Sequence, residues 1–250
     1  MPTHLKTSGG AAASKAGIAY EHLVHSVTRQ LTPKHSTLPF NTQMPQQLGG
    51  SSSQHDILCN WKTLYDTPIE IKKQGAIDWM QCSLFYGKKG WQPSKKGKNG
   101  GACRALFTEL IRGHSLYKSV PPFFEHSLSY EQWSKYKKDY PTLIIPIPDS
   151  VISELYRLKG SKYIQISQHG LYKTTEHDFC DFDVPRFSCE TVLRVRVKVH
   201  STGLKSGGPC KMSVIASPYP VGLMTMSHSG SSLDSFYTVP HGLLYNPLVR

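Results

Sequence analysis

The segment Pro68–Lys72 alternates apolar and charged residues, which leaves few structures open to it. Because successive side chains of a β-strand point to opposite faces, the pattern predicts a half-buried strand with Glu70 and Lys72 on one face. A strand, or the end of one, at His55–Cys59 would place Asp56 beside them. Two carboxylates and an ammonium group arranged in this way can hold a hard divalent cation and orient a water molecule against a phosphate.

The spacing of these three residues, D-x13-E-x-K, resembles the motif of the PD-(D/E)xK nucleases, the restriction-endonuclease-like family. The proline that often precedes the aspartate in that family is replaced here by His55. Upstream, Gly17–Glu21 resembles the G-x3-E motif on the first helix of many of these nucleases. The resemblance implies a single-domain α/β (α+β) fold, in which a central mixed sheet is flanked by helices.

The resemblance also implies roles for individual residues. Asp56 and Glu70 would bind a metal ion together with the main-chain carbonyl of Ile71, and Glu21 would act through a second metal ion or a water molecule. Lys72 would position or deprotonate the attacking water and stabilise the charge that builds on the phosphorane. The implied cofactor is Mg²⁺, for which Mn²⁺ is the expected substitute.

Two helices are predicted around this motif. Apolar residues recur at three- and four-residue steps over 14–31, and Ser14 can cap that helix. Residues 76–86 show a similar spacing, and within them Asp78 and Gln81 resemble positions that support the site in several nuclease branches. The prolines and the GGSSS run of residues 32–53 predict a loop.

Net charge points to a polyanionic partner. The chain carries a formal net charge of +12 and has a pI of about 9.4, which favours a nucleic acid, and with the nuclease motif double-stranded DNA. Lysines cluster in a glycine-rich stretch, 87–101, and basic residues alternate along one face of a strand predicted at 191–200. The expected DNA contacts are Lys88, Lys89, Lys95, Lys96, Lys98, Arg194, Arg196 and Lys198.

The second half of the chain is predicted to be rich in strands, at 142–147, 162–167, 191–200 and 211–217. Residues 1–13 are expected to be flexible, and 14–250 to form one nuclease domain. Within that domain we expect a catalytic core at 14–140, which includes the basic loop, a β-rich half at 141–217 that completes the DNA cleft, and a C-terminal coil at 218–250.

Several other classes are disfavoured. No apolar run reaches the length of a membrane span, and the N-terminus lacks the apolar core of a secretory signal, so we expect an intracellular protein. The six cysteines include no CxxC pair, and neither a P-loop nor a GxSxG motif is present. The weaker alternative of a zinc site would draw on His177, Cys180, Cys189, His200 and Cys210.

These observations predict a Mg²⁺-dependent DNA endonuclease, with a site-specific enzyme of the type II restriction kind as the first hypothesis. The alternatives are a recombination or repair nuclease, either an exonuclease or a junction resolvase, and a non-catalytic basic DNA-binding protein on the same fold. The sequence is compatible with a monomer or a homodimer.

Overall fold

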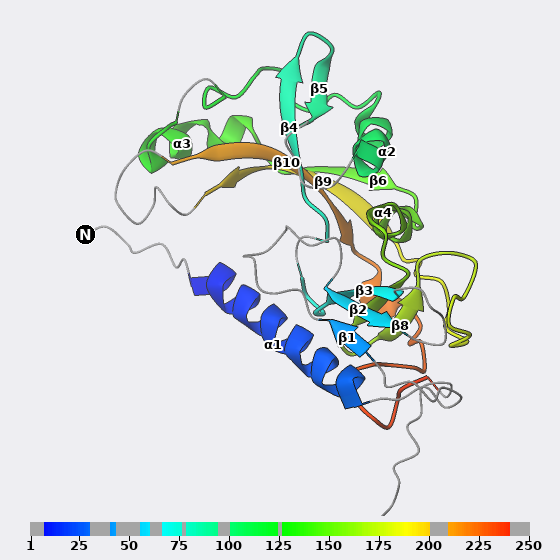
Figure 1. Ribbon diagram of the computed structural model, residues 1–250. Coiled ribbons are helices and arrows are strands. Elements are labelled where there is room, and N and C mark those ends of the chain that lie inside the picture. The colour runs from blue at the N-terminus through cyan, green and yellow to red at the C-terminus, as the bar shows by residue number, and fades with distance from the viewer. Residues whose placement is uncertain are drawn as a thin grey trace, which may run out of the picture. The chain divides into compact units, whose positions relative to one another are not determined.

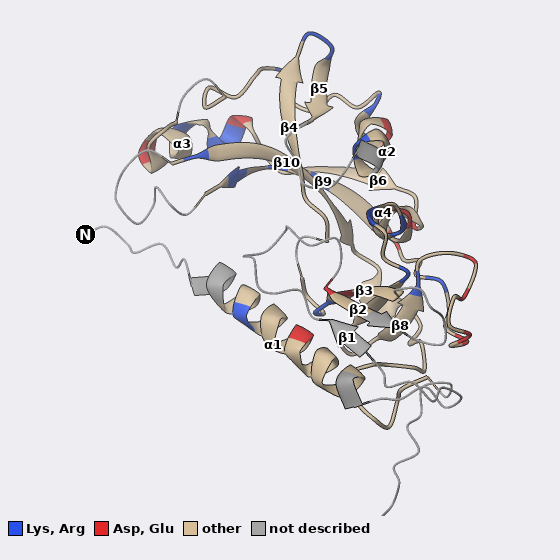
Figure 2. Cartoon of the chain, viewed as in Figure 1, with Lys and Arg blue, Asp and Glu red and all other residues tan. Residues whose placement is uncertain are grey.

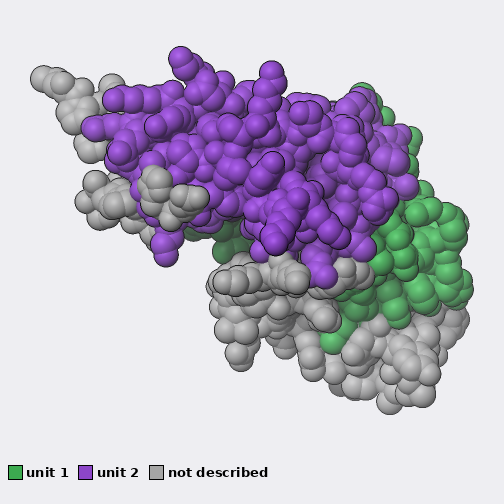
Figure 3. All heavy atoms as spheres, turned by 90° about the horizontal axis from the view of Figure 1, so that it is seen from above, with its two compact units in different colours: residues 1–77, 152–189, 222–250 green, residues 78–151, 190–221 purple. Residues whose placement is uncertain are grey.

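In the part of the chain that the computed structural model describes, the protein is mixed α+β with two five-stranded sheets (Figure 1). The structure describes residues 8–30, 41–43, 56–60, 67–76, 79–94, 101–124, 127–200 and 210–240. The chain divides into two compact units, coloured separately in Figure 3. Unit 1 consists of residues 1–77, 152–189 and 222–250, and unit 2 of residues 78–151 and 190–221. Among the described helices, none combines the length and the apolar character needed to cross a membrane.

Unit 1 is built on a mixed sheet in the order β1-β2-β3-β7-β8. Neighbouring strands are antiparallel except β3 and β7, which run parallel. A parallel pair needs a crossover connection, and the helix α4 directly precedes β7 in the chain. The bounds are β1 Asn41–Gln43, β2 Ile57–Asn60, β3 Thr67–Lys72, α4 Val151–Lys159, β7 Tyr163–Ile166 and β8 Gly170–Lys173.

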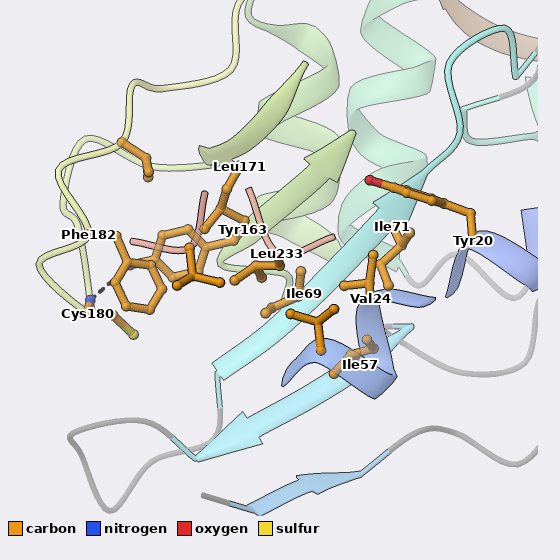
Figure 4. Packing of buried hydrophobic residues seen from close by; sticks show 13 residues of the cluster. Tyr20, Val24, Ile57, Ile69, Ile71, Tyr163, Leu171, Cys180, Phe182 and Leu233 are labelled. Carbon is orange, nitrogen blue, oxygen red and sulfur yellow. Dashed lines mark hydrogen bonds between the residues drawn. The ribbon is translucent and has the colours of Figure 1, made fainter. Parts of the chain in front are cut away.

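The long helix α1, Ser8–Gln30, packs against this sheet (Figure 4). Tyr20 and Val24 are buried in the same apolar cluster as Ile69 and Ile71 of β3. The helix predicted over 14–31 is therefore confirmed, but it begins at Ser8, so residues 8–13, which were expected to be flexible, form its first turns and include three alanines that favour helix. Because its two isoleucines lie on the α1 side, β3 turns its charged residues to the opposite face.

The C-terminal segment completes the core of unit 1. Leu233 and Val239 are buried in the same cluster, and the Leu233 N–H donates a 2.8 Å hydrogen bond to Oε1 of the buried Gln165. Between Gly222 and residue 240 the chain forms a short 3-10 turn, η2, at Leu223–Thr225 and otherwise neither helix nor strand, while residues 241–250 of the expected coil lie outside the described residues. The final strand, however, continues to Pro220, beyond the predicted end at residue 217.

Unit 2 contains an antiparallel sheet in the order β5-β4-β10-β9-β6. Its longest pair, β9 with β10, extends from Thr191, which pairs with Pro220, to Val199, which pairs with Met212. The bounds are β4 Cys82–Gly87, β5 Gly90–Pro93, β6 Leu143–Ile147, β9 Thr191–Val199, β10 Met212–Pro220, α2 Gly101–Ile111, α3 Tyr130–Tyr136 and the 3-10 helix η1 Lys137–Asp139. The strands predicted in the second half of the chain are confirmed, but they are shared between the two sheets.

The helix predicted at 76–86 is wrong. Cys82 and Leu84 are buried and Ser83 is exposed, so the true period is two, and the segment forms β4. Lys88 and Lys89 make the turn of a β4–β5 hairpin rather than part of an open loop, and Gly90 supplies the positive φ of 78° that follows the turn. Residues 95–100, which include Lys95, Lys96 and Lys98, lie outside the described residues.

Candidate active site

Glu70 lies at the centre of a charged cluster in unit 1. It stands on β3, between β2 and β7, and is only 2% exposed. Its Oε1 accepts a hydrogen bond from Nζ of Lys72, and its Oε2 accepts one of 2.7 Å from Nζ of Lys159. Burial would raise the pKa of Glu70, but the two ammonium groups outweigh that effect and hold the pKa below its usual value.

Asp56 is fixed at the start of β2 by contacts with β3. Its N–H donates to the carbonyl of Ile69 at 3.2 Å, and its Oδ2 accepts a hydrogen bond of 2.7 Å from the N–H of Ile71. The same Oδ2 lies 4.0 Å from Nζ of Lys72. Burial, reinforced by the charge of Glu70 and opposed by Lys72, raises the pKa of Asp56 to about 6. The structure therefore brings together the three residues that the spacing motif singled out.

Glu21 contributes a third carboxylate from α1. It follows the buried Tyr20 at the edge of the apolar face of the helix, and its side chain is half-buried. Burial raises its pKa to about 7, the charge of Asp56 adds to the rise, and Lys72 opposes it. Glu21 thus belongs electrostatically to the same cluster as the two carboxylates of the sheet.

Two residues of α4 complete the cluster, and neither was predicted from the sequence. Tyr156 is buried, with 1% of its surface exposed. Nζ of Lys72 lies 5.4 Å from the centroid of its ring, and Nζ of Lys159 lies 5.6 Å from it. Cations at this range are attracted by the face of an aromatic ring. The one available signal was the three-residue spacing of Tyr156 and Lys159, which places them on one face of a helix.

The donor set of this cluster suits a divalent cation in charge and in chemistry. With all groups ionised, three carboxylates face two ammonium groups, and the pKa values of Asp56 and Glu21 are raised in consequence. Within the described part of the chain, Oδ1 of Asp56 and the carboxylate of Glu21 accept no hydrogen bond. Glu70 differs, because both of its oxygens are bound by lysines. Hard oxygen donors of this kind are those that Mg²⁺ prefers.

Geometry limits how the ion would be held. Among the described residues, no three of the His, Cys, Asp and Glu side chains are arranged to hold a metal ion as they stand. A cation at Asp56 and Glu21 would therefore gain Glu70 as a ligand only if that carboxylate released one of its two lysines. The same finding leaves the zinc alternative without a ligand group in the described ranges.

The other predicted site residues belong to unit 2. Oε1 of Gln81 accepts a 2.7 Å hydrogen bond from Lys198 of β9, and Asp78 lies outside the described residues. Arg194 lies over the ring of Tyr219, at 5.1 Å from its centroid. Arg194 and Arg196 share with Lys198 one face of β9, as the alternation predicted, because Leu193 and Val195 on the other face are fully buried.

Searches of protein-family models, of curated proteins and of solved structures each return no match for this chain. The chemistry of the cluster therefore rests on its own residues.

The raised carboxyl pKa values predict a measurable dependence of stability on pH. The folded protein keeps Asp56 protonated up to about pH 6, whereas the unfolded chain releases this proton near pH 3.8. Protonation of Asp56 therefore adds to the free energy of unfolding at low pH, and this contribution is lost as the pH rises through about 6. Two pKa units correspond to roughly 3 kcal/mol as an upper bound. Asp56→Asn, which keeps the acceptor for Ile71, should therefore be more stable than the wild type at pH 8 and nearly equal to it at pH 4.

The measurement is urea unfolding of both proteins at pH 4 to 8 in EDTA, taken as the difference between them. Taking the difference removes the opposite effects of His169 and His200, whose pKa values are lowered, whereas Glu21 and Glu70 interact with the charge of Asp56 and stay part of the difference. Asp183→Asn is the matched control, since Asp183 is exposed and its φ of 54° suits asparagine equally well. A difference that does not change with pH would contradict the assignment of the raised pKa to Asp56.

Proposed function

We propose that unit 1 carries the active centre of a Mg²⁺-dependent deoxyribonuclease, an endonuclease that hydrolyses phosphodiester bonds. The observation that carries the proposal is the convergence of Asp56, Glu70 and Lys72 at the end of β3, joined by Glu21 from α1 and Lys159 from α4. The finer proposals are a restriction-endonuclease-like fold for unit 1 and site-specific cleavage of the type II kind. Support for the fold comes from the mixed sheet of unit 1, which has α1 against one face and α4 residues against the other.

The metal would be held by Asp56, Glu21 and the main-chain carbonyl of Ile71, and by Glu70 once one of its two lysines has left it. In a strand the N–H and C=O of one residue point to the same side, so the carbonyl of Ile71 faces the side on which its N–H meets Asp56. When bound, Mg²⁺ polarises the phosphate and lowers the pKa of a water molecule. Mn²⁺, which prefers the same oxygen ligands, should substitute for it.

The protonation states divide the work among the side chains. The carboxylates around Lys72 outweigh its burial and hold its pKa well above the usual value, so this lysine is charged at neutral pH and acts as a donor. It would orient the attacking water and stabilise the negative charge that builds on the phosphorane. Glu21, whose pKa without a metal ion is about 7, would release its proton on binding the metal.

Double-stranded DNA is the proposed partner, and basic groups of unit 2 support it. Figure 2 shows basic residues in blue at the turn between β4 and β5, where Lys88 and Lys89 are exposed. Arg194, Arg196 and Lys198 add positive charge along one face of β9. Because sequence-independent DNA affinity comes mainly from phosphate contacts, these basic groups are suited to bind the phosphates of the duplex.

A second candidate function, a non-catalytic DNA-binding protein, is favoured by one observation. Both carboxylate oxygens of Glu70 are bound by lysines, an arrangement that neutralises the charge a metal ion would need. In that case the cluster would only stabilise unit 1. The proposed enzyme requires instead that Lys72 or Lys159 leaves Glu70 when the metal ion and DNA bind.

Incubation of the purified protein with supercoiled plasmid, linear plasmid and a four-way DNA junction, in Mg²⁺ and in EDTA, tests the proposal. Discrete fragments that need Mg²⁺ support a site-specific endonuclease. A shrinking smear from linear DNA would indicate an exonuclease instead. Cleavage confined to branched DNA would indicate a junction resolvase. A shift in mobility without cleavage would overturn the enzyme and favour the binding protein.

The salt dependence of binding tests the grip of the β4–β5 turn. Lys88→Gln/Lys89→Gln should weaken binding to all duplexes alike and lower the slope of log affinity against log salt by about 0.9 for each phosphate that a lysine no longer neutralises. Fluorescence anisotropy in EDTA at several salt concentrations measures it, with the exposed Lys118→Gln as the control. If the slope equals that of the wild type, the phosphate contacts would be assigned to Arg194, Arg196 and Lys198 on β9 instead.

A further inference from the structure

Unit 2 contains a groove that the proposed active centre does not use. It has a volume of about 650 Å³ and lies between the α3–η1 segment and the end of β9. Its lining includes Trp133 and Tyr140 together with Val197 and Val199. Volumes of this size are typical of ligand sites.

The groove exists because the apolar face of β9 is only partly covered. Leu193 and Val195, at the start of that face, are fully buried, whereas Val197 and Val199 further along are half-exposed. An apolar sheet face left open to water is costly unless something else covers it.

The aromatic part of the groove is preformed. Trp133 is 6% and Tyr140 8% exposed, and their rings stack with centroids 6.4 Å apart and an interplanar angle of 27°. A capping box between Ser129 and Gln132 fixes the start of α3, which carries Trp133. The hydroxyl of Tyr140 is 3.2 Å from that of Ser119. Little ordering is therefore needed when a ligand enters, and this favours affinity.

The charge of the groove selects the ligand chemistry. Lys137 and Lys138 line it, and neither forms an ion pair with any described residue. No Asp or Glu belongs to the described lining, and the half-buried Tyr130 adds a third aromatic ring. A partly open aromatic ring beside ammonium groups that pair with no described residue suits a nucleotide, whose base stacks on Tyr130 while its phosphate meets the lysines.

We propose that this groove binds an unpaired segment of single-stranded DNA. The bases of a duplex are stacked on one another, so they cannot reach an apolar, aromatic surface, whereas unpaired bases can. The inference extends the proposed function, since it assumes a DNA partner, but it does not depend on cleavage. It adds a second nucleic-acid site, which would hold a strand separated from its complement.

Binding of a labelled 12-nucleotide oligo-dT, measured by anisotropy with the full chain in EDTA, tests this proposal. Tyr130→Ala and, separately, Lys137→Gln/Lys138→Gln should each weaken binding by about 10-fold, because the first removes one base stack and the second leaves two phosphates without a lysine. Affinity for a 12-base-pair duplex should change less than 2-fold. The lysine pair is exposed, so its replacement leaves the fold intact, and Lys118→Gln is the control for charge.

Other outcomes would overturn the inference. Unchanged oligo-dT affinity in both variants, or an equal loss for single-stranded and duplex DNA, excludes a strand-specific groove. Displacement of oligo-dT by dTMP at equal nucleotide concentration would assign the groove to free nucleotides, and displacement by an apolar peptide but by no nucleotide would assign it to a protein partner. Plasmid cleavage is scored separately, so its absence would reject the nuclease and leave the groove in place.

Discussion

Asp56→Asn should lower the rate of plasmid cleavage in Mg²⁺ by about 1,000-fold or more, since losing several kcal/mol of metal-dependent stabilisation removes three decades of rate. The amide keeps an oxygen for the N–H of Ile71, so the local structure survives. It removes the charge that, with Glu21, would hold the cation. DNA binding in EDTA should persist or become tighter, because one negative charge facing the phosphates is gone.

Single-turnover cleavage of supercoiled plasmid measures this effect. Asp183→Asn is again the matched control and should cleave like the wild type, since Asp183 is exposed. Because Asp56→Asn is expected to be at least as stable as the wild type above pH 6, a loss of cleavage cannot be attributed to unfolding. Cleavage by Asp56→Asn at the wild-type rate would refute the assignment of the metal to this carboxylate.

Glu70→Gln should have the largest effect on stability, a loss of about 3–5 kcal/mol of unfolding free energy. The substitution leaves the ammonium groups of Lys72 and Lys159 without their shared counter-charge, although the side chains of both lysines are less than a fifth exposed. A domain whose total stability is about 5–15 kcal/mol would be left marginal. The same change should abolish cleavage, but the stability measurement is the more informative.

The double variant Glu70→Gln/Lys159→Met separates charge from packing. Removing one of the two unpaired ammonium groups should restore part of the stability that Glu70→Gln removes, measured by urea unfolding at pH 7. Glu154→Gln is the matched control, because Glu154 pairs with Arg157 on the same helix at a much more exposed position and should cost little. Additive effects in the double variant would show that Lys159 and Glu70 are not energetically coupled.

Local patterns predicted the part of the candidate site that lies on adjacent strands. The alternation around Glu70 and Lys72 fixed β3 and its faces, and an antiparallel neighbour brought Asp56 to them. Lys159 could not be predicted in the same way, because it reaches Glu70 only through the crossover that makes β7 parallel to β3. The contact between Lys159 and Glu70 depends on the order of the strands in the sheet, and the spacing of residues in the sequence does not reveal that order.

The misassigned helix at 76–86 has a different cause. Met80 and Leu84 stand four residues apart, as on a helix face, but Cys82 and Leu84 also fit a period of two. A short apolar run does not decide between the two periods, and pairing with β10 and β5 decides in favour of the strand. Each of the two units draws on distant parts of the chain, and residues 78–151 separate β3 from β7 and β8 of the same sheet.

The position of the metal ion tests the central claim most directly, because traces of a foreign nuclease can imitate cleavage but cannot place a cation. Anomalous diffraction from crystals soaked in Mn²⁺ locates the ion without reference to activity. We predict a peak in contact with the carboxylate of Asp56 and the main-chain carbonyl of Ile71, with Lys72 or Lys159 withdrawn from Glu70. Crystals with no peak at Asp56 at a Mn²⁺ concentration that supports cleavage, or with Glu70 still bound by both lysines beside an ion elsewhere, would contradict it.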